Sequence, residues 1–388
     1  MTLDLFCRVV DNYGDIGVCW RLARQLADEH GVAVRLWVDD LASFRRICAA
    51  VDPAAEEQLL QGVTVRRWHD HMAAQDVAEV VIEAFGCALP VAYLEAMAAR
   101  ATSPVWINLE YLSAEDWVAG CHGLPSPHPQ LPLVKYFFFP GFDAGAGGLL
   151  AEAGLEQRRA DFAGDPRQKA AFLAGLGVHP APDGNLISLF CYPTAPVPAL
   201  LDALRDDASP SLLLVPEGVA SAVLANWAGK PLARGDMVRR GSLALQVVPF
   251  LDQPDYDRLL WCCDLNFVRG EDSMVRAQWA QKPFVWHIYP QEEDAHRIKL
   301  DAFLAKFSGG SGGIVPDTAD ACRAAWHAWN GDGDLGASWP AFRDALPALE
   351  AHMPEWCGRL REQGDLAGKL LAFVHQVAQR SAASGPGA

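Results

Sequence analysis

The sequence predicts an α/β protein of two domains, each built as a parallel sheet covered by helices in the manner of a Rossmann fold. Three observations support this prediction. The chain has 388 residues, more than a single hydrophobic core usually serves. Its composition is 51% hydrophobic and 21% charged, which is typical of a globular protein. Short β-rich runs alternate with helical patterns, and the alternation begins afresh near residue 184.

The first half predicts one Rossmann-like unit. We expect strands at residues 3–10, 32–38, 63–68, 77–85 and 105–109. A turn at residues 11–17 precedes a helix that runs to about His30, and a second helix is expected at residues 89–100. We assign residues 1–183 to this domain.

The second half repeats the alternation. We expect strands at residues 186–191, 212–215, 243–248, 265–268 and 284–288, with helices at residues 198–205, 220–228, 255–262 and 272–280 between them. We assign residues 184–364 to this domain. The connection before it, residues 144–184, is rich in Gly and Ala, and the last helix, at about residues 365–380, is expected to return to the first domain.

Charge and composition exclude several classes of protein. A net charge of −16 and a pI near 5.1 argue against binding to nucleic acid, which relies on clustered Lys and Arg. The ten cysteines are scattered without a CxxC pair, as reduced core residues would be. No signal peptide and no apolar run of bilayer-spanning length is evident. We therefore expect a cytoplasmic protein that does not enter a membrane.

The turn at residues 11–17 holds two carboxylates, Asp11 and Asp15, at the start of a helix. It lacks the GxGxxG spacing that cradles a dinucleotide pyrophosphate, which disfavours a nicotinamide oxidoreductase. Two carboxylates in such a turn can face a cleft and accept a proton or stabilise a developing cation. The more ordinary interpretation is that Asp11 shapes the turn and Asp15 caps the helix, both common duties of aspartate. The spacing leaves both interpretations open.

A second strand-to-helix turn, residues 269–273, reads RGEDS. Gly270 permits close approach of the backbone, and the helix start at Glu271, Asp272 and Ser273 offers N–H donors to a diphosphate, with Arg269 adding positive charge. Acidic and hydroxyl residues are also favoured in any first helical turn, so the local pattern does not decide between the two interpretations.

Aromatic and amide side chains collect after the predicted strands of the second half. Each alone is more typical of core packing, but the carboxyl ends of strands are where open α/β sheets bind ligands. Together they are candidates to stack on and hydrogen-bond a nucleobase: Phe190, Tyr192, Phe250, Gln253, Tyr289 and Gln291.

The stretch FCRVVDNYGDIGVCWRLARQL at residues 6–26, together with RGEDS at residues 269–273, resembles the EarP family of bacterial elongation factor P arginine rhamnosyltransferases. The resemblance runs over essentially the whole chain. It implies a GT-B fold, in which two Rossmann-like domains face one another across a cleft. It also implies that L-rhamnose passes, with inversion, from dTDP-β-L-rhamnose to the guanidinium of one arginine of elongation factor P, which then relieves ribosomes stalled at proline runs.

The resemblance also implies roles for individual residues. The family's catalytic carboxylates fall on Asp11, Asp15 and Glu271, and we take Asp15 as the base. No cofactor is implied, and we expect transfer without a metal ion, because the helix tip after Gly270 and Arg269 can stabilise the leaving group. The donor-binding positions fall on Phe190, Tyr192, Phe250, Gln253, Arg269, Glu271, Asp272, Ser273 and Tyr289.

Two alternatives remain beside this expectation. One is another GT-B enzyme that transfers a sugar to a different acceptor. The other is a non-catalytic protein that binds elongation factor P through the same cleft.

Overall fold

A computed structural model describes residues 1–11, 13–69, 76–291, 295–309 and 313–383. Asn12 of the first turn and part of the 309–313 glycine segment lie outside the described residues. The chain divides into two compact units. Unit 1 comprises Met1–Ala153 and Leu360–Ala388, and unit 2 comprises Gly154–Arg359.

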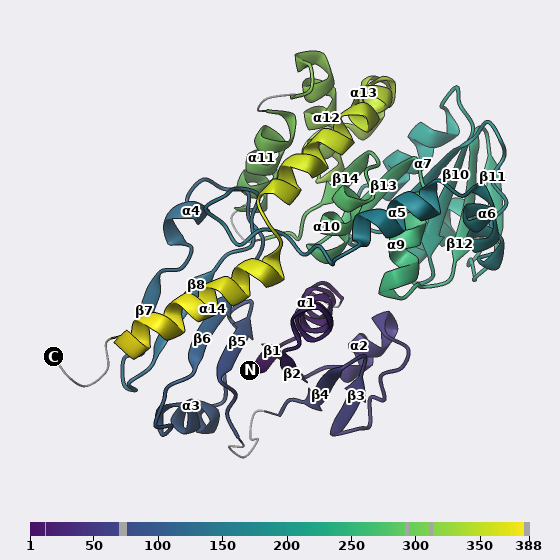
Figure 1. The fold of residues 1–388 in the computed structure, drawn as a ribbon. Coiled ribbons are helices and arrows are strands. Elements are labelled where there is room, and N and C mark those ends of the chain that lie inside the picture. The colour runs from purple at the N-terminus through teal and green to yellow at the C-terminus, as the bar shows by residue number, and fades with distance from the viewer. Residues whose placement is uncertain (12, 70–75, 292–294, 310–312, 384–388) are drawn as a thin grey trace. The chain divides into compact units, whose positions relative to one another are not determined.

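Unit 1 contains one sheet and five helices among its described residues (Figure 1). Its strands are β1 (Thr2–Cys7), β2 (Ala33–Val38), β3 (Glu57–Leu60), β4 (Val63–Arg67), β5 (Val80–Ala84), β6 (Val105–Leu109), β7 (Pro125–Pro127) and β8 (Val134–Phe138). Its helices are α1 (Gly14–His30), α2 (Leu41–Ile47), α3 (Val91–Ala98), α4 (Val118–Cys121) and α14 (Leu366–Ala383).

The sheet of unit 1 has the strand order β3-β4-β2-β1-β5-β6-β8-β7. The six strands from β4 to β8 pair in parallel, and only the edge strands β3 and β7 are antiparallel. The chain starts at β1 and extends the sheet first through β2 and later through β5, on the other side. The strand order therefore reverses between β1 and β5, and such a switch point is where open α/β sheets bind ligands.

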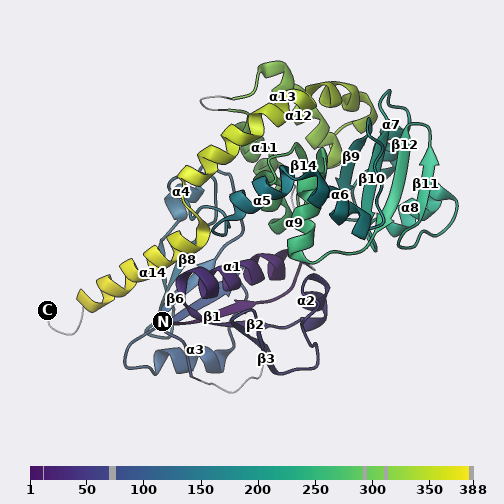
Figure 2. The same ribbon diagram turned by 45° about the vertical axis from the view of Figure 1, so that its right-hand side comes forward.

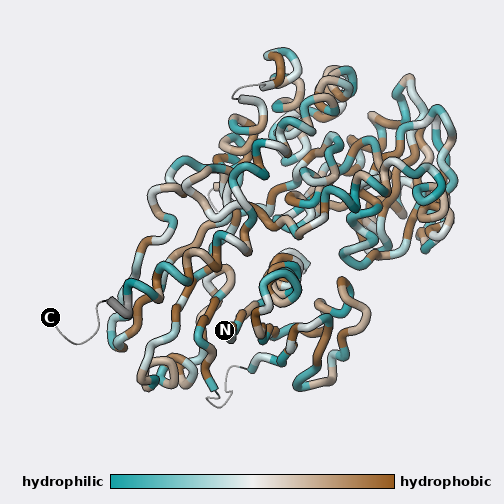
Figure 3. The backbone as a smooth tube through the Cα atoms, viewed as in Figure 1, coloured by the Kyte–Doolittle hydropathy of each residue, from teal (hydrophilic) through white to brown (hydrophobic). Residues whose placement is uncertain are grey.

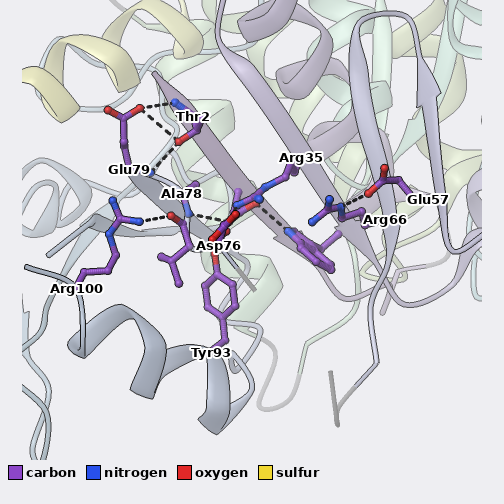
Figure 4. A network of polar contacts seen from close by, with 12 residues as sticks. Thr2, Arg35, Glu57, Arg66, Asp76, Ala78, Glu79, Tyr93 and Arg100 are labelled. Atoms are coloured by element: carbon purple, nitrogen blue, oxygen red, sulfur yellow. Dashed lines mark hydrogen bonds and ion pairs between the residues drawn. The ribbon is translucent and has the colours of Figure 1, made fainter. Parts of the chain in front are cut away.

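A buried carboxylate of β1, Asp4, bonds to neighbouring parts of unit 1, and Figure 4 shows its partners Arg35, Ala78 and Tyr93. Asp4, fully buried, accepts bonds from Arg35 Nε at 2.5 Å and Arg35 Nη2 at 2.6 Å. It also accepts from Trp37 Nε1 at 2.9 Å, from the Ala78 N–H and from the Tyr93 hydroxyl. Because these bonds link β1 to β2, to the residues just before β5 and to α3, the network fixes the sheet that carries the first turn.

The last helix packs on unit 1. Leu366, Leu370, Val374 and Val377 of α14 are buried at helical spacing, and α14 alternates between hydrophobic and hydrophilic along its length (Figure 3). The helix contacts α1 and β6, and the Leu366 N–H donates to the Leu149 carbonyl at 2.9 Å. Thus the chain ends in the unit where it begins, as the sequence predicts for residues 365–380.

Unit 2 also has a single sheet, seen in Figure 2 beside its helices. Its strands are β9 (Asn185–Leu189), β10 (Ser211–Pro216), β11 (Met237–Arg240), β12 (Leu243–Val248), β13 (Leu265–Arg269) and β14 (Phe284–His287). Its helices are α5 (Leu155–Ala163), α6 (Pro166–Gly175), α7 (Val197–Arg205), α8 (Ser221–Ala228), α9 (Gln253–Cys262), α10 (Asp272–Trp279), α11 (Ala295–Ser308), α12 (Pro316–Trp329) and α13 (Leu335–Glu362).

The strand order of unit 2 is β11-β12-β10-β9-β13-β14, and all pairs except β11 with β12 are parallel. Again the first strand, β9, lies between one strand that follows it directly and one that comes much later. The switch point of this unit is therefore between β9 and β13. Each half of the chain is a Rossmann-like α/β unit, as the alternation of patterns predicts.

The boundary between the units differs from the one predicted near residue 183. The structure places it after Ala153, because α5 and α6 pack in unit 2. Phe162 of α5 lies 5.6 Å from Trp261 of α9, measured between ring centres, and 5.9 Å from Phe172 of α6. The Gly- and Ala-rich composition of residues 144–184 concealed this small aromatic contact.

The first strand is shorter than the predicted residues 3–10. It ends at Cys7 because the next backbone N–H groups bond to side chains instead of to a neighbouring strand. The Val9 N–H donates to Asp39 Oδ1 at 2.9 Å, and the Val10 N–H donates to Asp15 Oδ2 at 2.8 Å. Side-chain carboxylates thus replace the neighbouring strand as hydrogen-bond acceptors where the turn at residues 11–17 begins.

No helix among the described residues is both long and apolar enough to cross a bilayer. The ten cysteines are free, and all except Cys121 are buried, in agreement with the prediction that they are reduced core residues.

Candidate functional site

Asp15 is the best-anchored carboxylate of the first turn. Its side chain is only 2% exposed, and Oδ2 accepts the backbone N–H groups of Val10 and Asp11, each at 2.8 Å. Both bonds use Oδ2, so neither engages Oδ1. Asp15 also occupies the first turn of α1, where the helix dipole favours negative charge. The turn therefore holds one carboxylate in a single orientation at the switch point of unit 1.

Burial sets the electrostatics of this carboxylate. Desolvation raises the pKa of Asp15 above its ordinary value, the backbone bonds from Asp11 and Val10 oppose this rise, and the charge of Asp39 adds to it. A carboxylate with a raised pKa is a stronger base than an ordinary aspartate. The same environment that anchors Asp15 therefore suits it to accept a proton.

Asp11, partly buried, shapes the turn and approaches α1 closely. Its carbonyl accepts the Gly14 N–H at 2.6 Å. A Cβ added at Gly14 would meet Asp11 Oδ2 at 2.5 Å, so any side chain at that position would displace the Asp11 carboxylate. Asp11 therefore shapes the turn, as one interpretation predicts, but Asp15 does not cap the helix: the N-cap residue of α1 is Tyr13, without a side-chain cap bond, and Asp15 instead accepts the N–H groups of two residues that precede the helix.

In unit 2 the candidate donor residues gather at the switch point. Phe190 and Tyr192 follow β9, and Arg269 ends the adjacent strand β13. The guanidinium carbon of Arg269 lies 4.6 Å from the ring centre of Phe190 and 4.5 Å from that of Tyr192. Arg269 Nη1 also reaches the Cys191 carbonyl at 3.5 Å. This stacking fixes a cation between two aromatic rings at the edge where a ligand is expected.

The turn after β13 leads directly into α10. Gly270 has a φ of +59°, a left-handed conformation that favours glycine, and its carbonyl accepts the Trp286 indole N–H at 2.7 Å. The Ser273 hydroxyl bonds to both backbone groups of Arg269, accepting from its N–H at 3.0 Å and donating to its carbonyl. The buried Ser273 side chain therefore closes the turn, while the start of α10 supplies a helix N-terminus.

A second helix begins beside α10. Gln253, the first residue of α9 and only 4% exposed, donates to Asp272 Oδ2 at 3.1 Å. One helical turn further along each helix, Arg276 bonds to Asp257 through Nε at 3.0 Å and Nη2 at 2.7 Å. These two contacts hold the N-termini of α9 and α10 at the same edge. Glu271 precedes α10 as its N-cap residue and is partly exposed.

The remaining aromatic candidates lie at the same edge. Phe250, after β12, is 6.1 Å from Phe190 in an edge-on arrangement, and both rings are partly exposed. Tyr289, after β14, is 5.4 Å from Tyr192 and 44% exposed. The structure therefore brings together all nine residues predicted to bind the donor, within one unit. Asp11 and Asp15 belong to unit 1, whereas Glu271 belongs to unit 2.

Sequence reasoning missed His287, the last residue of β14. Its Nδ1 accepts the Tyr192 N–H at 3.2 Å, and its ring lies 5.3 Å from that of Tyr192. Burial, followed by the charges of Arg269 and His296, lowers the pKa of His287 to about 4. A neutral imidazole thus positions the backbone after β9. Only its place at a strand end could have identified it from the sequence.

No group of three or more His, Cys, Asp or Glu side chains in the described part of the chain is arranged to hold a metal ion.

Comparison with known proteins decides the family. The model of the elongation factor P rhamnosyltransferase family EarP matches residues 3–375. The chain belongs to this family. EarP proteins are glycosyltransferases, so the chain is an enzyme of that class.

Relatives in the family span nearly the whole chain. The protein-arginine rhamnosyltransferase of Pseudomonas putida is 54% identical over 374 residues, which cover 96% of this chain and 98% of the relative. That of Pseudomonas aeruginosa is 52% identical over 371 residues, with 95% and 98% covered. That of Shewanella oneidensis is 42% identical over 389 residues, with 96% and 97% covered.

Solved structures agree on the fold. A structure from work on EarP-mediated arginine glycosylation of translation elongation factor EF-P is 40% identical, with a TM-score of 0.69 and 97% of this chain and 99% of that chain covered. The spinosyn rhamnosyltransferase SpnG is 11% identical with a TM-score of 0.53, over 96% of this chain and 100% of that chain, and shows likeness of fold alone. The chain thus has the GT-B fold class that the EarP resemblance implies, with two Rossmann-like units.

Proposed function

We propose that this chain transfers L-rhamnose, with inversion, from dTDP-β-L-rhamnose to the guanidinium of one arginine of elongation factor P. Its membership of the EarP family is the observation that carries the proposal, since the relatives are named protein-arginine rhamnosyltransferases. The two ligand edges support it. One presents carboxylates to a cationic acceptor, and the other presents aromatic rings, an arginine and a helix N-terminus to a nucleotide.

The donor edge matches the chemistry of a thymidine diphosphate sugar. Phe190 and Phe250 are partly exposed rings suited to stack on the base, and the nearby amide of Gln253 is suited to hydrogen-bond it. The diphosphate meets the N-terminus of α10, beginning at Glu271, Asp272 and Ser273, and the charge of Arg269. Tyr192 and Tyr289 complete the edge beside Arg269.

The chemistry of the acceptor arginine explains why the reaction needs carboxylates. An arginine guanidinium stays protonated at physiological pH, so its nitrogen lone pairs are delocalised and poorly nucleophilic. Carboxylates bind and orient a guanidinium in bidentate pairs, and the family's catalytic carboxylates fall on Asp11, Asp15 and Glu271. They also stabilise the positive charge that develops on the sugar, in the way carboxylates do during glycoside hydrolysis.

The reaction then proceeds in one displacement. A guanidinium nitrogen attacks the anomeric carbon of rhamnose, the C–N bond forms on the face opposite the leaving group, and the bond from that carbon to the dTDP oxygen breaks. Asp15 accepts the proton that the nitrogen loses. The electron pair of the broken bond leaves with dTDP, whose charge the α10 N-terminus and Arg269 stabilise, so no metal ion is needed.

Mass spectrometry of elongation factor P after incubation with the chain and dTDP-rhamnose tests this function. We expect a gain of one deoxyhexose on one arginine. Transfer of a different sugar, or to a different acceptor, would favour another GT-B activity. Tight binding of elongation factor P without any transfer would favour the non-catalytic alternative. Because elongation factor P acts in translation, we place the reaction in the cytoplasm.

A further inference from the structure

Phe85 adopts a conformation that is costly for an aromatic residue. Its φ is +58°, and among the four described non-glycine residues with positive φ it is the only aromatic one. Gly86 follows with a φ of +68°, and the Cys87 N–H donates to the Ala84 carbonyl at 3.1 Å. Strain of this kind persists only where the surroundings enforce it, and it concentrates at ligand sites.

The strained turn lies at the switch point of unit 1. It follows β5, which pairs with β1 through Phe6 and Glu83, and Cys87 Sγ donates to the Phe6 carbonyl at 3.3 Å. The turn that holds Asp15 follows β1. The Phe85 turn and the Asp15 turn therefore leave adjacent strands at one edge, on the two sides of the point where ligands are expected.

The strained conformation directs Phe85 onto Tyr111. The two rings are stacked, with centres 4.6 Å apart and planes 21° from parallel, and both side chains are partly exposed. Tyr111 follows β6, the next strand along, where Ala84 pairs with Leu109. The Phe85 N–H holds this register by donating to the Leu109 carbonyl at 2.7 Å.

A carboxylate, Glu110, is fixed at the residue that precedes Tyr111. Asn108 is only 3% exposed, and both ends of its amide are used. Its Oδ1 accepts the Gly86 N–H at 3.1 Å, and its Nδ2 donates to Glu110 Oε1. Asn108 thus joins the strained turn after β5 to the carboxylate that immediately precedes Tyr111. Aromatic faces together with a fixed carboxylate are what a guanidinium binds, by stacking and by charge-assisted hydrogen bonds.

We propose that Tyr111, stacked on Phe85, and Glu110 form the subsite that selects the acceptor arginine. This inference rests on the proposed function and adds specificity determinants that neither sequence motif contains. The Tyr111 ring stacks on the guanidinium or its stem, and Glu110 accepts its N–H groups while Asp15 remains the base. Phe85 and Asn108 are positioning residues, which act through Tyr111 and Glu110.

Variants of the enzyme, each combined with native and altered elongation factor P, test the subsite. Binding and transfer are measured for wild type, Tyr111→Ala, Tyr111→Phe and Glu110→Gln with native elongation factor P. Binding is measured again with elongation factor P whose acceptor arginine is replaced by alanine. For native elongation factor P we expect Tyr111→Ala and Glu110→Gln to weaken binding roughly tenfold and to raise KM, whereas Tyr111→Phe stays within about twofold.

Elongation factor P without the acceptor arginine distinguishes loss of the proposed contact from a folding defect of the enzyme variant. Loss of the acceptor arginine should remove most of the difference in binding affinity between wild type and Tyr111→Ala, because the proposed contact is then already absent. Affinity for dTDP should be the same in all variants, which shows that the other unit is intact. An equal loss of affinity for both acceptors, or no loss for native elongation factor P, would overturn the subsite.

The two proposals fail in different ways. Wild-type chain that binds both acceptors equally and transfers no sugar would contradict the proposed function itself. Wild-type chain that transfers rhamnose and prefers the native acceptor, with the same preference retained in Tyr111→Ala and Glu110→Gln, would contradict the subsite alone.

Discussion

At the scale of single residues, the candidate ligand edge of each sheet combines a charged side chain with contacts that fix its orientation. Asp15 is held by two backbone N–H groups, and Arg269 is held between two rings. The motifs at residues 6–26 and 269–273 predict which residues these are. They do not predict the partners His287, Phe85 and Tyr111, because backbone angles and contacts between distant strand ends leave no local pattern.

Arg269→Lys tests the stacked cation. Lysine keeps the charge but loses the planar face that lies on Phe190 and Tyr192. We expect kcat/KM for dTDP-rhamnose to fall roughly tenfold to a hundredfold, which corresponds to about 1–3 kcal/mol of stacking energy. Steady-state kinetics with the donor varied measure this. Unchanged kinetics in Arg269→Lys would show that charge alone matters.

The lowered pKa of His287 predicts an effect of pH on stability. The folded-state pKa, about 4, lies below the ordinary value, so the unfolded chain binds the proton more tightly. The free energy of unfolding is therefore at its full value above about pH 6.5 and declines by up to about 3 kcal/mol towards pH 4. In His287→Asn this part of the decline should vanish, because asparagine accepts the Tyr192 N–H without titrating.

Urea unfolding of wild type and His287→Asn at neutral pH and at pH 4.5 measures the difference. A wild-type decline that the variant reproduces in full would assign the acid sensitivity to other groups.

At the scale of elements, the alternation of patterns predicts most of the interior strands, although not β8, and predicts the antiparallel edge strands poorly. The edge strands β3, β7 and β11 are short and antiparallel, and each exposes residues on both faces, so no clear period marks them. Likewise α5 is polar over most of its length, and a few apolar side chains, Phe162 among them, assign it to unit 2. Local composition cannot reveal which core such a helix joins.

The paired helices α9 and α10 give a prediction about stability. Arg276 and Asp257 form a buried ion pair, with side chains 2% and 8% exposed. Arg276→Met leaves a buried carboxylate without its cation, and we expect the free energy of unfolding to fall by about 3–5 kcal/mol. Affinity for dTDP should fall as well, because the two helix N-termini lose a shared anchor.

The exposed pair Arg258–Asp255 on the same helix provides the control. Its side chains are 49% and 40% exposed, so Arg258→Met should cost less than about 1 kcal/mol. Chemical denaturation and dTDP titration compare the two variants. Equal effects of Arg276→Met and Arg258→Met would contradict a structural role for the buried pair.

At the scale of the whole molecule, both units have the same Rossmann-like architecture. Each has its first strand at the centre of a parallel sheet and its candidate ligand residues at the switch point beside that strand. The sequence predicts this repetition, since the alternation restarts after residue 184. It does not predict the exact division, because residues 154–183 join the second unit through packing rather than pattern.

The proposed mechanism predicts that the complete reaction needs no metal ion. In the proposed mechanism the α10 N-terminus and Arg269 stabilise departing dTDP, so transfer in excess EDTA should equal transfer without it. Initial rates with EDTA, and with EDTA followed by added Mg²⁺, measure this. A rate that falls with EDTA and returns with Mg²⁺ would show that a cation stabilises the leaving group.

The proposed base gives the most direct test of the whole account. Asp15→Asn keeps an oxygen to accept the N–H groups of Val10 and Asp11 but cannot take a proton at neutral pH. We expect kcat for arginine rhamnosylation to fall by about 10²–10⁴-fold, with dTDP affinity and thermal stability unchanged. Transfer by Asp15→Asn within a few-fold of wild type would contradict the account.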